Sequence, residues 1–222
     1  MVHGSTLSHG NNSKEYTSMA NSLLRANVEY RPIQLVSSNR TSQEIVGRLS
    51  GGDMTRGSCS SLALAYAGNV AGYDVLDYRD GYSRQFFSSR SSIQMIADMP
   101  GIQSNVLHGT NDFETANMLL VNMQSGKEYY LAAGGHAAIV RRSGNTYEYL
   151  ELQHPSNGNG WHVLNDNILR WRFGCNQSRT FMCSSFLIDV DSMTHSSEFL
   201  NILGFINTVE SNQKKGVAGN VR

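Results

Sequence analysis

The stretch GGDMTRGSCSSLALAYAGNVAGYDVLDYR, residues 51–79, places a single cysteine between a glycine-rich polar turn and an apolar run. Apolar residues such as Leu62 and Tyr66 recur in that run at helical spacing. The spacing predicts a helix that begins near Ser58, a favourable N-cap residue, with Cys59 in its first turn. Unpaired backbone N–H groups and the positive end of the helix dipole stabilise a thiolate at such a position. The stretch therefore predicts a nucleophilic thiol.

The other two cysteines fit the usual alternative, in which a free thiol is a small buried apolar group. Cys183 lies within an apolar strand pattern and Cys175 is equally isolated, whereas Cys59 has serines on both sides. Three cysteines cannot all pair and none forms a Cys-x-x-Cys motif, so a disulfide scaffold or a zinc ribbon is not indicated. A zinc site built from Cys175, Cys183 and His195 would require wide, irregular spacing. We expect reduced thiols, no metal and no cofactor.

Length and charge restrict the class of protein further. A chain of 222 residues is long enough for one well-packed domain. The 18 basic and 18 acidic residues cancel, which argues against nucleic acid or an anionic membrane surface as the main partner. The N-terminal segment lacks the apolar core of a signal peptide, and no window approaches the ~18 apolar residues of a membrane span. We expect a soluble protein made in the cytoplasm without a classical signal peptide.

Helical patterns dominate the first half of the chain and strand patterns the second, which favours an α+β fold with helices packed on an antiparallel sheet. Besides the helix at Cys59, the periodicity predicts helices within 13–30, 41–52, 89–101, 111–126 and 196–210. It predicts strands within 73–79, 128–135, 136–144, 145–153 and 181–191, with a hairpin turn at 143–145. We expect a flexible N-terminus (1–12), a single domain (13–207) and a flexible tail (208–222).

A thiol nucleophile needs a general base, and His136 is the strongest candidate. It begins the apolar strand HAAIV directly after AAGG, so small residues leave room around its ring. His3 and His9 lie in the loose N-terminus. The alternative is a histidine that only caps the end of a strand.

The next strand, TYEYLELQ, offers a partner that orients the base. Its alternation places Glu151 and Gln153 on one face, near the end of the hairpin where His136 lies. A carboxylate or amide there would hold the imidazole through its second nitrogen. The alternative is that Glu148 and Glu151 are solvent-side charges on an exposed hairpin.

The chain resembles the papain-like fold, and within it the papain-fold toxin domains of bacterial polymorphic and injected effectors. Four features carry the resemblance in this order: a cysteine that opens a helix, AGYDVLDYR, GGHAAIV and YLELQ. The resemblance covers roughly residues 50–165. It implies that Cys59 is the nucleophile, His136 the general base and Glu151 the orienting acid, with Gln153 beside it. Family members usually carry aspartate and then proline at the last motif, where this chain has glutamate and leucine.

The resemblance implies a cysteine-dependent amide hydrolase that acts as an antibacterial toxin. Its substrate would be a peptide, a peptidoglycan peptide or a glutamine side chain of a protein, and its delivery would use a secretion system. A separate immunity protein would neutralise it in the producing cell. The backbone N–H of Cys59, with Thr55 or Arg56 from the preceding loop, would hold the oxyanion. Trp161 would form either a wall of the cleft or the start of the next core element.

An alternative function is a non-catalytic interaction domain on the same scaffold, such as a phage-structural or secretion-apparatus component in which Cys59 is incidental. Thiol alkylation separates the two hypotheses. Rapid and selective labelling of Cys59 favours the enzyme, and slow labelling of all three cysteines favours the binding module.

Overall fold

A computed structural model describes residues 12–50, 57–77, 81–153 and 158–213 of the chain. Thr55, Arg56 and most of the predicted flexible ends lie outside these residues. Within the predicted tail, Thr208 is buried and residues Glu210–Asn212 form a 3-10 turn.

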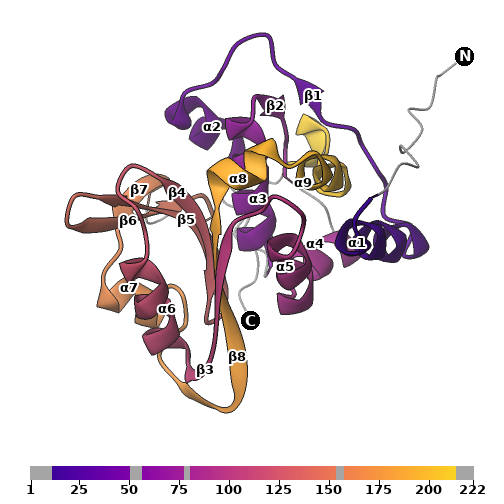
Figure 1. Ribbon diagram of the computed structural model, residues 1–222. Helices are drawn as coiled ribbons and strands as arrows, with labels where there is room; N and C mark the ends of the chain where they lie inside the picture. The colour runs from indigo at the N-terminus through magenta and orange to yellow at the C-terminus, as the bar shows by residue number, and fades with distance from the viewer. Residues whose placement is uncertain (1–11, 51–56, 78–80, 154–157, 214–222) are drawn as a thin grey trace, which may run out of the picture.

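A six-stranded antiparallel sheet forms the centre of the fold, with the order β3-β8-β4-β5-β6-β7 (Figure 1). Its strands are β3 (Ser104–Asn111), β4 (Glu128–Ala133), β5 (His136–Ser143), β6 (Thr146–Glu151), β7 (Gly160–Val163) and β8 (Ser178–Asp189). A separate two-stranded sheet joins β1 (Gln34–Leu35) to β2 (Tyr73–Asp74). Helices combined with an antiparallel sheet confirm the predicted α+β class.

Helices cover both faces of the sheet because successive strand residues point to opposite sides. On β4, Tyr130 packs into the cluster formed with α1, α3, α5, α8 and α9, and Leu131 packs into the cluster formed with α6 and α7. Figure 1 shows α6 and α7 on the side of the sheet away from α3 and α5. The helices are α1 (Lys14–Arg25), α2 (Ser42–Leu49), α3 (Ser58–Val70), α4 (Tyr82–Phe87), α5 (Arg90–Ala97), α6 (Asp112–Val121), α7 (Asp166–Trp171), α8 (Val190–His195) and α9 (Ser197–Ile202).

Two elements differ from the predictions because long-range contacts replace the regular pattern. The predicted strand 73–79 is a strand only at Tyr73–Asp74. Beyond it, the Leu76 carbonyl accepts from the Thr208 N–H at 3.0 Å, and the Leu76 N–H donates to the Asn207 side chain. The predicted helix 196–210 ends early, because α9 stops at Ile202 and a 3-10 turn follows.

Strands β3 and β7 were not among the predicted elements, because their sequences alternate weakly. Edge strand β3 reads SNVLHGTN and is half-buried, so it carries little apolar signal. The predicted hairpin turn is confirmed: Ser143 pairs with Thr146, and Gly144 has a φ of 59°.

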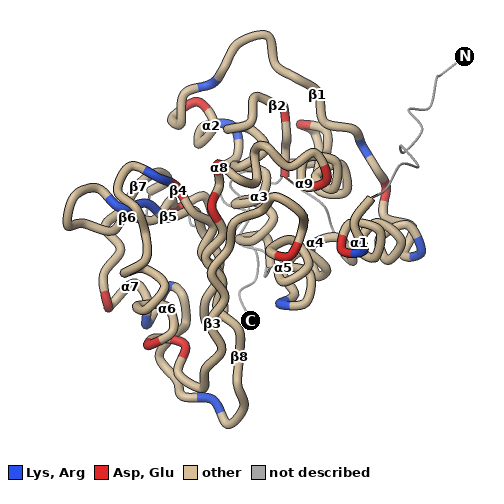
Figure 2. The backbone as a smooth tube through the Cα atoms, in the orientation of Figure 1, with Lys and Arg blue, Asp and Glu red and all other residues tan. Residues whose placement is uncertain are grey.

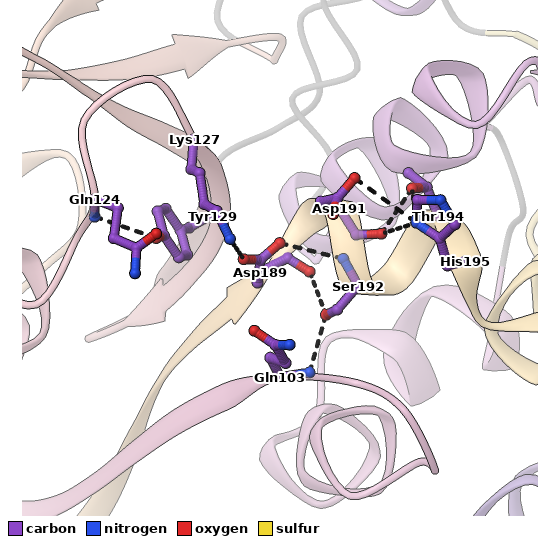
Figure 3. Close-up of polar contacts among 9 residues, drawn as sticks. All are labelled: Gln103, Gln124, Lys127, Tyr129, Asp189, Asp191, Ser192, Thr194 and His195. Carbon is purple, nitrogen blue, oxygen red and sulfur yellow. Dashed lines mark hydrogen bonds and ion pairs between the residues drawn. The ribbon is translucent and has the colours of Figure 1, made fainter.

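A polar cluster closes the end of the sheet where β4 begins and β8 ends (Figure 3). Asp189 accepts from the Ser192 N–H at 3.2 Å and forms an ion pair with Lys127 at 2.9 Å. The Ser192 hydroxyl donates to the Asp189 carbonyl and accepts from the Gln103 N–H. These contacts cap α8 and tie it to the start of β4, so we interpret the cluster as structural.

Charge is spread over the described chain. Figure 2 shows basic and acidic positions interspersed on the helices and strands. No helix in the described ranges combines the length and apolar character that crossing a membrane requires.

Candidate active site

Cys59 lies in the first turn of α3, as predicted, but the cap of that helix is a glycine. Gly57 occupies the N-cap with a φ of 94°, a left-handed conformation that favours glycine, and Ser58 is already helical. The expectation that Ser58 caps the helix is therefore wrong. Its hydroxyl instead accepts a hydrogen bond from Gln153 Nε2 at 2.9 Å.

Buried serines on either side of Cys59 fix the start of α3. Ser60 Oγ donates to the Phe87 carbonyl at 2.7 Å and lies 2.7 Å from the Tyr130 hydroxyl. Ser58 and Ser60 are buried, whereas Cys59 is half-buried. The thiol is thus held at a helix N-terminus whose neighbours are anchored to α4 and β4.

His136 begins β5 directly after the turn Gly134–Gly135, which closes the hairpin with β4. The Gly135 N–H donates to the Phe173 carbonyl at 2.7 Å, and the His136 ring packs edge-on against the Phe173 ring at 4.9 Å. Arg90 and Arg179 both donate to the Gly134 carbonyl, at 2.7 and 3.4 Å. Contacts with α5, β8 and the segment after α7 therefore fix the turn that presents His136.

Glycine is required at position 134. Its φ is 59°, and a Cβ there would lie 2.3 Å from the Phe173 carbonyl oxygen. We expect Gly134→Ala to lower the free energy of unfolding by ~2–4 kcal/mol, because left-handed strain adds to a backbone clash. Chemical denaturation measures this loss. Gly144→Ala is the matched control, since Gly144 has the same φ with no atom within 4 Å, so we expect only the strain, ~1–2 kcal/mol. Equal losses in the two variants would contradict the predicted clash.

Cys59 and His136 line the same cavity, of about 250 Å³. The rest of the lining comes from the N-terminal ends of α3 and α5, the β4–β5 turn and β8. No hydrogen bond joins the thiol to the ring within the part of the chain that the structure describes. Contacts between catalytic groups are commonly long in free enzymes and shorten when substrate binds.

Burial disfavours the charged form of both groups. It raises the pKa of the Cys59 thiol, although the backbone N–H of Ala137 and the charge of Arg172 partly offset this by favouring the thiolate. Burial and, to a lesser degree, the Arg172 charge lower the pKa of His136 to about 3, although the Glu151 carboxylate partly offsets them. Desolvation thus opposes the thiolate that a helix N-terminus favours, and the predicted thiolate at Cys59 stays a prediction.

Glu151 and Gln153 lie beside the pair, but the contacts described for their side chains go elsewhere. Glu151 is buried and forms a bidentate ion pair with Arg172, at 2.7 and 2.9 Å. Gln153 accepts from Arg172 at 3.2 Å and donates to Ser58. Both residues line a small cavity with Cys59 and His136. A direct hydrogen bond from either to the ring stays a prediction.

Arg172 lies beside the site, and no sequence pattern indicated it. It follows α7, outside the segment that carries the resemblance, and no local pattern marks it. Its guanidinium joins Glu151 to Gln153, and Gln153 joins it to the helix of Cys59. A buried glutamate late in a strand was the available signal, because it requires a buried cation.

Other predicted residues take structural places. Trp161 lies in β7 and packs against the cluster around α3, with Arg141 stacked over its ring at 4.0 Å, which supports the core interpretation. Cys175 and Cys183 are buried, as expected, and burial raises the pKa of Cys175 to about 12. His195 is exposed on α8. Across the described ranges, no group of three or more His, Cys, Asp or Glu side chains is arranged to hold a metal ion.

Comparison with known proteins gives one distant structural likeness. No protein-family model matches the sequence, and no curated protein matches it. Among solved structures, the chain is similar to the Salmonella effector SpvD in its R161 variant, with a TM-score of 0.36 and 11% identity. That alignment covers 82% of this chain and 94% of the effector chain.

Proposed function

We propose that the chain is a cysteine-dependent amide hydrolase in which Cys59 is the nucleophile and His136 the general base. The observation that carries the proposal is the shared cavity: a half-buried thiol at a helix N-terminus and a strand-end imidazole line it together. The first-turn N–H groups of α3, the Cys59 N–H among them, have no partner within the helix and are suited to hold an oxyanion.

The reaction starts from the neutral pair. The Cys59 thiol passes its proton to His136 as the sulfur attacks the amide carbonyl, so that an S–C bond forms. The imidazolium then protonates the leaving nitrogen, the C–N bond breaks, and a thioester remains. Water, deprotonated by His136, releases the acid and restores the thiol. These reaction steps require a neutral imidazole in the resting enzyme, and the lowered pKa of His136 favours that form.

The proposed biological role is that of an antibacterial effector toxin, which rests on the sequence resemblance to papain-fold toxin domains. The substrate amide would belong to a peptidoglycan peptide or to a glutamine side chain of a protein. An immunity protein that occludes the cavity would protect the producing cell.

Expression in a bacterium tests this role. We expect the chain to slow growth, more strongly with an added signal peptide if peptidoglycan is the target, and from the cytoplasm if a protein glutamine is the target. Cys59→Ala should restore growth at equal protein level, as judged by immunoblot, because the nucleophile is lost. Equal growth of the wild type, Cys59→Ala and an empty-vector strain in both compartments would refute the effector role.

A further inference from the structure

Arg90 carries the one fixed charge among the described residues that line the cavity of Cys59 and His136. It is the first residue of α5, and its side chain is partly buried. The remaining lining residues in the described ranges are small, apolar or uncharged apart from His136. A cation in a cavity with low-dielectric walls produces a stronger field than a cation on an open surface.

Two backbone carbonyls hold the Arg90 guanidinium in place. Its Nε donates to the Ser184 carbonyl at 3.1 Å and its Nη2 to the Gly134 carbonyl at 2.7 Å. Its Nη1 makes no hydrogen bond to any described residue, so its two N–H groups can donate to a ligand. The side chain is therefore preorganised, and binding an acceptor would cost little further rotamer freedom.

The charge of Arg90 is not compensated by a carboxylate within the described residues. Two other arginines differ in this respect: Arg172 pairs with Glu151 at 2.7 Å, and Arg179 pairs with Asp112 at 2.5 Å. The contacts of Arg90 are to neutral carbonyl groups, which fix its position and leave its net charge. The positive ends of α3 and α5 also meet at this cavity and add to the potential.

We propose that Arg90 binds a carboxylate of the substrate, so that the enzyme selects amides in peptides with an acidic group close to the scissile bond. Guanidinium donors match carboxylate geometry, and the interaction is charge-assisted. This inference rests on the proposed function, because it assigns the substrate class of the same cavity. It favours an acidic peptide over an uncharged amide as the substrate.

Two alkylating reagents of nearly equal shape test the inference without a known substrate. Iodoacetate and iodoacetamide both react with a thiolate: an S–C bond forms, the C–I bond breaks and iodide leaves. They differ in that iodoacetate carries a carboxylate. The rate of Cys59 modification by each reagent is measured by mass spectrometry of the intact folded chain. The iodoacetate rate is divided by the iodoacetamide rate, and this ratio is divided by the same ratio for free cysteine. The fraction of thiolate cancels in this ratio.

We expect the normalised ratio to fall about five-fold in Arg90→Gln, as loss of one screened charge near the sulfur implies. Arg90→Lys should keep most of the ratio because it keeps the charge. Salt should lower the wild-type ratio, since the Debye length shrinks from ~30 Å at 0.01 M to ~3 Å at 1 M. Arg142→Gln is the matched control: Arg142 donates to the Gly144 carbonyl of the turn at the opposite end of β5, and its loss should leave the ratio unchanged.

The outcomes separate the two proposals. A salt-insensitive ratio that is equal in the wild type, Arg90→Lys and Arg90→Gln would overturn the carboxylate site while Cys59 still reacts selectively with iodoacetamide. No modification of Cys59 by either reagent at any pH at which the chain stays folded would overturn the nucleophile, and with it both proposals. If Arg90→Gln does not fold, as judged by circular dichroism, the lysine variant and the salt dependence of the wild type still decide.

Discussion

Cys59→Ala and His136→Ala are each expected to lower turnover by about 10⁴-fold or more, and the double variant should lose little beyond either single variant. In the proposed mechanism the nucleophile and the base act as one unit, so removal of either would stop the acyl transfer. The measurement is amine release from a peptide or peptidoglycan amide that the wild-type chain hydrolyses. Circular dichroism and a thermal melt check that both variants are folded. Near-normal turnover in either single variant would refute the pair.

The same variants test the resting protonation state. Because the pKa of His136 is lowered to about 3, the imidazole is neutral above that pH. The ability of His136 to accept a proton should therefore persist as the pH falls well below 6.5, and should be lost only near pH 3.

Because the pKa of the Cys59 thiol is raised, its alkylation by iodoacetamide should rise with pH above the ordinary range for cysteine. His136→Ala should leave that alkylation profile unchanged. A half-rise at acidic pH that His136→Ala abolishes would instead indicate a thiolate–imidazolium pair.

Glu151→Gln is expected to lower the free energy of unfolding by ~3–5 kcal/mol, because it leaves the Arg172 charge without its buried carboxylate. The Glu151 side chain is 1% exposed and the Arg172 side chain 18% exposed, so water compensates little. Arg172→Met should cost a similar amount. The double variant should cost less than the sum of the two, because no uncompensated charge remains. Denaturant unfolding of the four proteins gives the coupling free energy.

Glu148→Gln is the matched control on the same strand. Glu148 pairs with Arg141 at 2.6 Å, but both side chains are partly exposed, and we expect a change of ~1 kcal/mol or less. A loss of turnover in Glu151→Gln at unchanged stability would contradict a structural role for the Glu151–Arg172 ion pair and indicate that the carboxylate acts on the His136 ring.

Gln153→Ala should chiefly loosen the start of α3, because Gln153 donates to Ser58.

The amino-acid pattern alone predicted the local features of the chain. Helical spacing after a glycine-rich turn placed Cys59 in a first helical turn, and His136 followed two small residues at a strand start. Period-two alternation gave the β4, β5 and β6 meander and its turn at Gly144. These features depend on propensity and periodicity over a few residues, which is the range that a single sequence encodes most directly. They also gave the α+β class.

Features that depend on segments far apart in the chain became visible only in the folded molecule. Arg172 reaches Glu151 across 21 positions, and Arg90 and Arg179 meet at the Gly134 carbonyl from α5 and β8. The weakly patterned edge strand β3 became visible through its pairing with β8. The pKa of Cys59 depends on both kinds of feature: a helix N-terminus is local and favours a thiolate, whereas desolvation depends on everything that packs around the sulfur and raises the pKa.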